Sequence, residues 1–344
     1  MTSSKLPSLQ GKRVSLIGGA GFIGHHLALS LANAGAHIQV VDSLQVNNLL
    51  AVQSQYEDAS RRDLYTRMIE ERLKLLRNLG VELLVEDARE YHRVAIALNN
   101  FQPEVVILLA AVAHAGRSNK DPYHTFDHSF RTLENVLDVT RSRPETHFVY
   151  FSSSMVYGNF ESASVDEDTP CNPLGIYGAL KLGGEKLVVA YHQVFGLPYT
   201  IIRPSALYGP RCISRRVIQV FIESAIAGKP LLVDGDGSSS IDFTYIDDLV
   251  AGVQLTLTKS EATNQTFNMT HGAAAPVSEV VDLLAQEFPN LDVEYQERDT
   301  LTPERGTLDI SKARDLLGYD PLTSVREGVP RYINWYIANS LTKK

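Results

Sequence analysis

The sequence predicts an α/β fold with a doubly wound parallel sheet and a smaller C-terminal α/β lobe. Short apolar segments alternate with amphipathic, helix-like segments from Val14 to Phe151, and this alternation is typical of parallel sheets with crossover helices. The first apolar segment, residues 14–17, runs directly into a glycine-rich turn. After residue 205 the segments become mixed and richer in Pro and Gly, which indicates the second lobe.

Three glycines in this turn predict a dinucleotide site. Gly18, Gly21 and Gly24 follow the strand at the spacing G-x-x-G-x-x-G. Glycine permits the tight turn, the close approach of the backbone to a pyrophosphate and the close packing of the next helix. The N-terminus of that helix offers free N–H groups and the positive end of its dipole to the phosphates. We therefore expect this turn, with Phe22 and Ile23, to bind the cofactor.

The residue after the second apolar strand indicates which dinucleotide is bound. That strand, residues 38–41, leads into Asp42. A carboxylate there can accept hydrogen bonds from both ribose hydroxyls and would repel a 2′-phosphate. No Arg or Lys occurs in the next few residues. The sequence therefore predicts NAD rather than NADP.

Composition and charge argue against several other kinds of partner. The chain has 344 residues, of which 44% are hydrophobic and 21% charged, and its net charge is −8. Without a long basic run, nucleic acid is not expected, and no apolar run approaches the ~18 residues of a membrane span. Residues 1–10 are polar and lack a signal-peptide core. The ten His are scattered without ligand spacing, so no metal is expected. The two cysteines are far apart, which suits a reducing cytoplasm.

The ends of the next strands are expected to face the same crevice, because ligands bind at the carboxyl ends of parallel strands. After the third strand, Asp87 and Ala88 are expected near the adenine, although a helix N-cap explains the acidic residue equally well. Small side chains after the fourth strand let the cofactor approach the backbone. Ala110 and Ala111 follow that strand directly, and they are expected to contact the cofactor together with Leu109 at the end of the strand.

Residues 48–80 form an unusual segment between the second and third strands. Its second part, residues 62–79, places leucines and a methionine at helical spacing among charged residues. We expect a long amphipathic helix that covers one face of the sheet, and a lid or an oligomer contact is the alternative.

A tyrosine and a lysine supply the expected acid–base chemistry. Tyr177 and Lys181 stand at positions i and i+4 of a predicted helix, so both side chains lie on one face. The ammonium group beside the phenol is expected to lower the pKa of Tyr177 below ~10, and it can also hold the nicotinamide ribose. The fifth strand leads into the serines at 152–154. Tyr177 can then act as the acid/base of an alcohol–ketone interconversion, with a serine hydroxyl sharing the substrate oxygen.

These motifs together resemble the extended short-chain dehydrogenase/reductase family, in its nucleotide-sugar epimerase/dehydratase branch. The matching stretches are GGAGFIG at 18–24, VVDSL at 40–44, LAA at 109–111, SSSMVYG at 152–158, YGALK at 177–181, RPSALYGPR at 203–211, GKPLLVDGDG at 228–237, DFTYIDDL at 242–249 and DISKARDLLGY at 309–319. The resemblance implies an NAD-binding Rossmann domain over 11–204, with returning segments at about 243–272. Residues 205–242 and 273–344 would form the smaller substrate-binding lobe.

The resemblance also implies roles for individual residues. Tyr177 would be the base and Lys181 its partner. Ser153 would be the catalytic hydroxyl, because the family's Ser or Thr lies four residues before the Tyr of VYG, here Tyr157. Pro204 would be a further NAD contact. The family commonly forms homodimers through the helices at 126–137 and 177–191.

Several positions depart from the family pattern. Ser154 and Met155 stand where members that dehydrate at C5–C6 have Asp-Glu, so 4,6-dehydration is disfavoured and Ser154 is expected to contact the substrate. A helix Asn found in many relatives is Ser129 here. The Asn and Arg that often hold the substrate diphosphate are Ala206 and Ile241, which weakens that interaction.

Arginines elsewhere could replace the lost donors, since guanidinium groups suit diphosphates. Arg211, Arg215 and Arg216 follow the YGP turn, and Arg305 lies in P-E-R-G. We expect Arg211, Arg216 and Arg305 to bind the substrate, with solvated surface charges as the alternative for Arg211 and Arg215. Cys212 is expected to be a packing thiol, with a role as second acid as the alternative.

The sequence thus favours an NAD-dependent nucleotide-sugar epimerase, acting at C4 through a transient keto sugar and regenerating NAD in each cycle. One alternative is a net dehydrogenase, reductase or decarboxylase on a sugar nucleotide or a smaller alcohol or ketone. Another is an NAD-binding scaffold without turnover.

Overall fold

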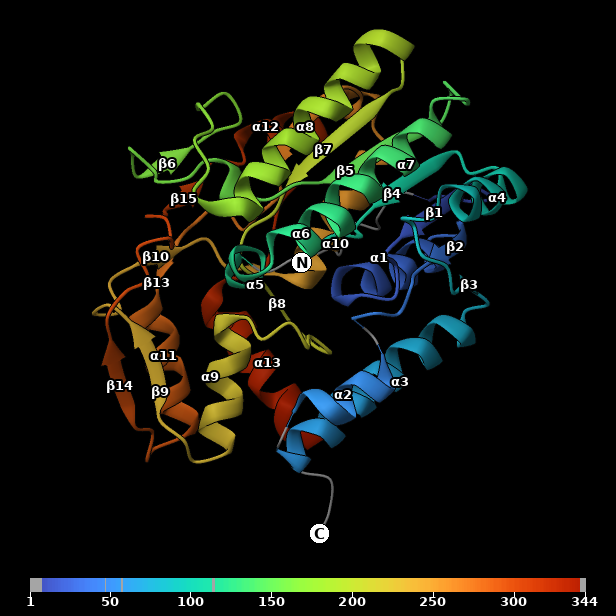
Figure 1. The fold of residues 1–344 in the computed structure, drawn as a ribbon. Helices are drawn as coiled ribbons and strands as arrows, with labels where there is room; N and C mark the ends of the chain where they lie inside the picture. Colours follow the sequence, from blue (N-terminus) through green and yellow to red (C-terminus); the bar gives the residue numbers. More distant parts are fainter. Residues whose placement is uncertain (1–7, 47, 57, 113–114, 341–344) are drawn as a thin grey trace.

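A seven-stranded sheet in the order β12-β7-β5-β4-β1-β2-β3 forms the centre of the molecule (Figure 1). The computed structural model describes residues 8–46, 48–56, 58–112 and 115–340. The strands of this sheet are β1 (Arg13–Ile17), β2 (His37–Val41), β3 (Glu82–Leu84), β4 (Val105–Leu108), β5 (His147–Phe151), β7 (Tyr199–Arg203) and β12 (Gln265–Asn268). All neighbouring strands are parallel, and β1 pairs with β2 on one side and β4 on the other. The expected doubly wound α/β fold is confirmed.

Helices cover both faces of this sheet and enclose separate hydrophobic cores. Val14 and Leu16 of β1 face one core, and Ile17 faces the other, as the two-residue period of a strand requires. The first face carries α1 (Phe22–Asn33) and α10 (Ile246–Thr256), and the second carries α4 (Tyr91–Phe101), α7 (Thr132–Thr140) and α8 (Gly175–Phe195). Before α7 lie α5 (Ala115–Lys120), α6 (Pro122–Phe126) and the π-helical turn Asp127–Arg131.

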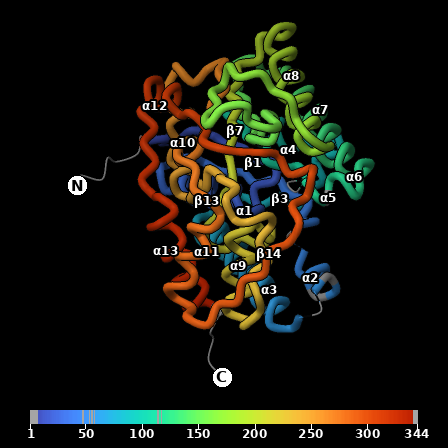
Figure 2. Tube along the Cα trace, turned by 90° about the vertical axis from the view of Figure 1, so that its left-hand side faces the viewer, coloured from blue at the N-terminus to red at the C-terminus, as the bar shows by residue number. Residues whose placement is uncertain are grey.

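A smaller lobe packs beyond the carboxyl ends of the strands (Figures 1 and 2). Its helices are α9 (Val217–Ile226), α11 (Val277–Glu287) and α13 (Val325–Ser340), whereas α12 (Ser311–Leu317) packs against α10 and the edge strand β12 of the large sheet. Four two-stranded sheets join β9 (Leu231–Asp234) to β14 (Val293–Gln296), β10 (Ser240–Ile241) to β13 (Ala275–Pro276), β8 (Leu207–Tyr208) to β11 (Thr244–Tyr245) and β6 (Ser164–Val165) to β15 (Thr307–Leu308). Short 3₁₀ turns occur at Ser154–Val156 and Ser260–Ala262. The chain returns to the large sheet between β11 and β13. There α10 packs on α1, and β12 forms one edge of the sheet.

The segment between β2 and β3 forms two helices, a short one followed by the long amphipathic helix expected over residues 62–79. They are α2 (Leu49–Gln55) and α3 (Ala59–Asn78), and Asn48 and Asp58 cap their N-termini through side-chain oxygens. The buried face of α3 packs in the same core as α1, α9 and α13. This segment therefore bridges the large sheet and the smaller lobe.

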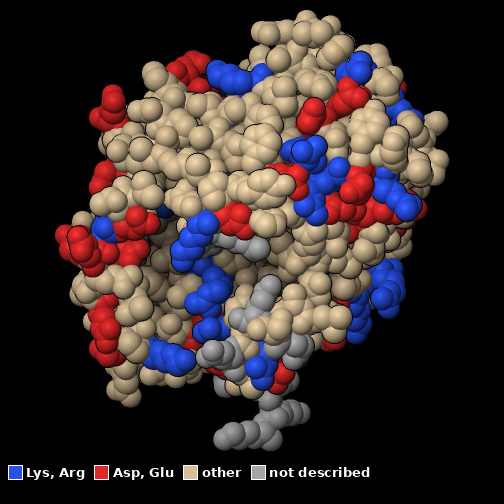
Figure 3. Space-filling model, in the orientation of Figure 1, with Lys and Arg blue, Asp and Glu red and all other residues tan. Residues whose placement is uncertain are grey.

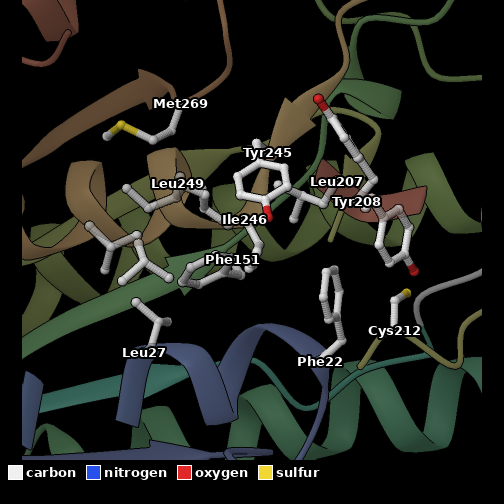
Figure 4. Close-up of a cluster of buried hydrophobic side chains, with 14 of the residues drawn as sticks. Phe22, Leu27, Phe151, Leu207, Tyr208, Cys212, Tyr245, Ile246, Leu249 and Met269 are labelled. Carbon is white, nitrogen blue, oxygen red and sulfur yellow. The ribbon is translucent and has the colours of Figure 1, made fainter. Parts of the chain in front are cut away.

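One continuous core joins the two parts of the molecule. Figure 4 shows Phe22 and Leu27 of α1 close to Phe151 of β5 and to side chains of the smaller lobe. Cys212 lies buried between aromatic rings of this cluster, and burial raises the pKa of its thiol. A protonated packing thiol, the expected reading of Cys212, fits this environment.

The described residues contain neither a membrane-spanning helix nor a cluster of metal ligands. No described helix combines the length and apolar character needed to cross a bilayer. No cluster of three or more His, Cys, Asp or Glu side chains that could hold a metal ion occurs in the same part of the chain.

Candidate active site

A cavity of about 470 Å³ opens where the strand ends meet the smaller lobe. Figure 3 shows a hollow on this face, with Lys and Arg side chains along it. Of the residues expected at the site, those lining the cavity are Ile23, Leu109, Ala111, Ser153, Ser154, Tyr177, Lys181, Pro204, Arg216 and Arg305. Those outside its lining are Gly18, Gly21, Phe22, Gly24, Asp42, Asp87, Ala88, Ala110 and Arg211.

The glycine turn has the geometry of a phosphate cradle. Gly18 has a φ of +84°, and a Cβ at this position would lie 2.6 Å from the backbone nitrogen of Ala110. A Cβ on Gly24 would lie 2.5 Å from the Cα of Gly19, so the helix could not pack this closely with any larger residue. Helix α1 begins after Gly21 without a side-chain cap. Its first N–H groups are therefore available to an anion, which is the arrangement that a bound dinucleotide needs.

Asp42 lies directly beside this turn. Its carboxylate accepts the N–H of Ala20 at 2.9 Å and the N–H of Leu44 at 2.8 Å. Burial raises the pKa of Asp42, and these two backbone hydrogen bonds oppose that effect. The carboxylate is thus held at the end of β2, where a ribose would lie against the glycine turn.

Asp87 and Ala88 lie at the end of β3, farther along the same edge of the sheet. The guanidinium group of Arg89 binds the Asp87 carboxylate at 2.6 Å and lowers its pKa. Gln45 donates to the same carboxylate at 3.2 Å. The carbonyl of Ala88 accepts a hydrogen bond from Asn135 at 3.1 Å. Asp87 therefore has protein partners of its own, in addition to any role at the adenine.

Ser153, Tyr177 and Lys181 converge on the cavity from two elements. Ser153 caps the 3₁₀ turn after β5, and its hydroxyl lies near enough to the phenol of Tyr177 to lower the pKa of that phenol. Tyr177 and Lys181 project from the first turns of α8, and the Lys181 Nζ donates to the carbonyl of Phe151 at 2.6 Å. A substrate hydroxyl placed here could contact both the serine and the phenol.

The expected lowering of the Tyr177 pKa is wrong for the structure as it stands. Burial raises the pKa of Tyr177, whereas Arg216 and the Ser153 hydroxyl lower it. Lys181 is directed to the Phe151 carbonyl instead of the phenol. Burial also lowers the pKa of Lys181 to about 8, against the influence of Glu185.

Arginines gather at the end of the cavity formed by the smaller lobe. Arg216 and Arg305 line it together with Arg298. Burial, and then the charges of Arg298 and Arg216, lower the pKa of Arg305 to about 10. Within the described residues, the buried Nε of Arg216 has no hydrogen-bond partner. The repulsion between Arg216 and Arg305 and the unused donor of Arg216 suit an anion here, although Arg298 already pairs with Glu304.

Arg211 does not join this group. Its backbone has a φ of +61°, and its side chain turns toward the first helix. The guanidinium group donates to His25 at 3.0 Å and pairs with Glu71 at 3.2 Å. The expectation that Arg211 contacts the substrate is therefore not met by its position, because both of its partners lie outside the cavity lining.

The positions that depart from the family pattern also lie near the site. Ser154, Met155, Ala206 and Ile241 all line the cavity. Ser129 lies in the π-helical turn, and its Oγ accepts the N–H of Val112 at 3.2 Å. None of these five side chains carries a carboxylate or a guanidinium group.

A family model described as the NAD dependent epimerase/dehydratase family matches residues 14–270. The chain belongs to this family. NAD is its cofactor, as the glycine turn and Asp42 predicted.

Individual members of the epimerase/dehydratase family show how wide the similarity is. The uncharacterized UDP-glucose epimerase YtcB of Bacillus subtilis is 35% identical over 232 residues, which are 67% of this chain and 73% of that protein. The dTDP-glucose 4,6-dehydratase of Xanthomonas campestris pv. campestris is 28% identical over 94% of this chain and 92% of that protein. The solved UDP-glucuronic acid 4-epimerase of Bacillus cereus, in complex with UDP-glucuronic acid and NAD, has a TM-score of 0.80 at 26% identity, with 94% of this chain and 98% of that chain covered.

Sequence reasoning missed three charged residues around the site. Glu185 lies four residues after Lys181 on α8. This spacing could have predicted that Glu185 shares a helix face with Tyr177 and Lys181. Arg203 forms a buried ion pair with Glu185 at 2.7 Å. Arg298 had no usable signal, because it lies in a polar stretch that resembles an ordinary loop.

Proposed function

We propose that this protein is an NAD-dependent nucleotide-sugar epimerase that acts at C4 through a transient keto sugar. The observation that carries the proposal is that Ser153 and Tyr177 line the same cavity as Arg216 and Arg305. The names of the relatives, which include UDP-glucose and UDP-glucuronic acid epimerases, support the same substrate class. We assign residues 11–204 and 243–272 to the NAD-binding part, and 205–242 and 273–344 to the substrate-binding lobe.

In this proposal the two hydroxyl groups handle the substrate proton. Ser153 and Tyr177 hold the oxygen at C4 between them, and Tyr177 takes its proton and later returns it. Arg216 and Ser153 favour the phenolate because both lower the pKa of Tyr177. NAD, when bound, accepts a hydride from the substrate and gives it back. Lys181, at the base of the cavity, holds the ribose next to the nicotinamide.

The arginines are proposed to bind the diphosphate of the substrate. Arg216 and Arg305 would supply the charge-assisted hydrogen bonds that Ala206 and Ile241 lack. Ser154 would contact the sugar. A diphosphate held at one end of the cavity keeps the sugar near Tyr177 at the other end. The keto sugar can still rotate about its link to the diphosphate and present its second face.

Dehydration at C5–C6 is disfavoured in this proposal. It would require acid–base residues next to Ser153, and Ser154 and Met155 cannot transfer protons in that way. A relative named as a dTDP-glucose 4,6-dehydratase makes a direct test necessary. Incubation with dTDP-glucose and UDP-glucose should give no 4-keto-6-deoxy sugar, measured by NMR, and its formation would reverse this assignment.

A net dehydrogenase, reductase or decarboxylase is the second candidate. It is favoured by Ala206 and Ile241, two cavity-lining side chains that stand where many family members have an Asn and an Arg for the substrate diphosphate. A net dehydrogenase or reductase would convert NAD or NADH stoichiometrically and a decarboxylase would release CO₂, whereas an epimerase would do neither. A scaffold that binds NAD without turnover would show neither product.

The decisive experiment uses the NAD-loaded protein with a panel of UDP-, dTDP- and GDP-sugars. Product epimers are followed by NMR and NADH by absorbance. We expect an epimer without accumulation of NADH. Tyr177→Phe should lose at least ~10²-fold in kcat, the lower range of general acid–base catalysis, and still bind NAD. The control is Tyr123→Phe, at a 79% exposed tyrosine. Full activity of Tyr177→Phe would refute the proposal.

Assembly and compartment are part of the same proposal. Phe126 is 52% exposed and stacks on Phe130, which supports a homodimer through the helices at 126–137 and 177–191. Cys171 and Cys212 are free thiols, which supports a cytoplasmic location. Light scattering should give the mass of a dimer, and Phe126→Glu should shift it to that of a monomer.

A further inference from the structure

We infer that helix α3 positions the arginine loop, residues 211–216, which carries Arg216 to the cavity. The connection runs through Tyr65 of α3 and Glu223 of α9. The assignment of a diphosphate to Arg216 rests on the proposed function, whereas the positioning of the loop does not.

The first part of the connection is a buried carboxylate shared by three helices. Glu223 is only 8% exposed. The hydroxyl of Tyr65, on α3, lies 2.8 and 3.0 Å from its two oxygens, and the hydroxyl of Tyr336, on α13, donates at 3.0 Å. Gln219, one turn earlier on α9, donates from its Nε2 to both Glu223 and Tyr65 at 2.8 Å. Arg61 of α3 adds an ion pair at 3.4 Å. Because Tyr65, Gln219 and Tyr336 are polar and buried, the loss of one leaves the others unsatisfied.

The second part joins this network to the arginine loop. The Oε1 of Gln219 accepts the backbone N–H of Arg215 at 2.9 Å, and the Arg215 guanidinium lies 3.7 Å from Glu223. At the other end of the loop, Arg72 of α3 donates from its Nε to the carbonyl of Arg211 at 3.0 Å. Helix α3 therefore holds the loop at both ends.

The loop needs such support because its backbone is strained. Arg211 and Arg215 both have positive φ values, +61° and +52°. Residues with a Cβ persist in this region only when the surrounding structure holds them there. Arg216 comes next, at the N-cap of α9, and its Nε is buried. If the loop relaxed, the Arg216 guanidinium would be displaced from the arginines of the cavity.

The test is Tyr65→Phe, which removes only the hydroxyl that α3 contributes to Glu223. The first measurement is hydrogen–deuterium exchange of the ligand-free protein over residues 209–219. We expect exchange there to increase tenfold or more, with no change at residues 14–24. The second is binding of UDP and of NAD by calorimetry. We expect the Kd for UDP to rise about tenfold, the loss of one hydrogen bond to a charged group, with the Kd for NAD unchanged.

The matched control is Tyr91→Phe. It removes a hydroxyl that donates to the Asp138 carboxylate at 2.9 Å, in an exposed position outside the cavity lining. This variant should leave both measurements at wild-type values. Arg72→Lys independently removes the hydrogen bond from the Arg72 Nε to the Arg211 carbonyl. It should also increase hydrogen–deuterium exchange over residues 209–219.

The outcomes separate the inference from the proposed function. Unchanged exchange over 209–219 in either Tyr65→Phe or Arg72→Lys would overturn the positioning role. An increase spread evenly over the whole chain would also overturn it, because that pattern reports general destabilisation. If the loop loosens in both variants but the wild-type protein binds no UDP, the nucleotide-sugar assignment fails and the positioning role stands.

Discussion

The hydroxyl of Ser152 donates a hydrogen bond to the buried carboxylate of Glu185 at 2.5 Å. Ser152 directly follows β5, whereas Glu185 lies on α8 with Tyr177 and Lys181. The same carboxylate pairs with Arg203 at the end of β7, through contacts of 2.7 and 2.9 Å. One carboxylate thus fixes the helix that carries the proposed acid–base residues against the ends of two strands.

Glu185→Gln should therefore be severely destabilising. The substitution leaves the guanidinium group of Arg203 buried without its counter-charge, which costs about 3–5 kcal/mol when one partner of a buried pair is removed. Urea unfolding measures this loss. The control is Glu279→Gln, whose partner Arg326 is 78% exposed, and which should cost less than ~1 kcal/mol. Equal losses in the two variants would show that the Glu185 carboxylate contributes no more than a surface charge.

The stability of the protein should rise with pH in the range where Lys181 titrates. Burial lowers the pKa of Lys181 to about 8, whereas an unfolded lysine has a pKa of ~10.4. Between these values the unfolded chain binds more protons than the folded one, so the free energy of unfolding increases with pH. The increase due to this group is on the order of 3 kcal/mol.

Lys181→Met isolates this effect, because methionine has no proton to lose. Unfolding in urea is compared between wild type and variant from pH 8 to 10.5. The wild type should gain stability relative to Lys181→Met over this range. Lys229→Met, at an exposed position, should follow the wild type. Parallel curves for wild type and Lys181→Met would contradict the lowered pKa of Lys181.

The parts of the fold and site that the sequence predicted correctly depend on short-range spacing. The strand–turn–helix from β1 to α1 needs only an apolar run followed by glycines. Gly18 lies against the backbone of Ala110 because the two residues follow β1 and β4, which are paired in the sheet. Tyr177 and Lys181 share a helix face because they are four residues apart. Such local patterns leave little freedom in three dimensions.

The features that the sequence did not predict depend on partners far along the chain. Arg211 turns away from the cavity because its backbone adopts a positive φ and its side chain meets His25 and Glu71. Tyr65 bonds to Glu223, which lies 158 residues later. No periodicity signals such a pair, so α3 could be predicted as an amphipathic helix but not as the support of a loop in the other lobe.

Removal of Arg305 should change stability and nucleotide binding in opposite directions. Its pKa is lowered to about 10 by burial and by the charges of Arg298 and Arg216, so Arg305→Met relieves repulsion in the ligand-free protein. The Tm without ligand should rise. The Kd for UDP should rise at least tenfold, because a charge-assisted hydrogen bond of about 1.5–3 kcal/mol is lost.

Both quantities follow from thermal unfolding with and without UDP. Arg326→Met is the control, since this arginine is exposed and pairs only with Glu279 among the described residues. It should leave the UDP-induced stabilisation intact. A lower Tm for ligand-free Arg305→Met would mean that Arg305 contributes packing or hydrogen bonds that outweigh the repulsion.

Ala206→Asn should stabilise the protein and strengthen the binding of UDP. Ala206 has a φ of +35°, in the region where a Cβ costs roughly 1–2 kcal/mol and where asparagine is tolerated best after glycine. The residue also lines the cavity, so an amide there adds a hydrogen-bond donor for a diphosphate, worth about 0.5–1.5 kcal/mol. Calorimetry should show a lower Kd for UDP, and thermal unfolding a Tm at or above that of the wild type. Ala273→Asn, at an exposed alanine with negative φ, should change neither. A weaker affinity for UDP in Ala206→Asn would mean that the space beside this alanine is occupied by an apolar part of the substrate, and it would favour the net redox enzyme over the epimerase.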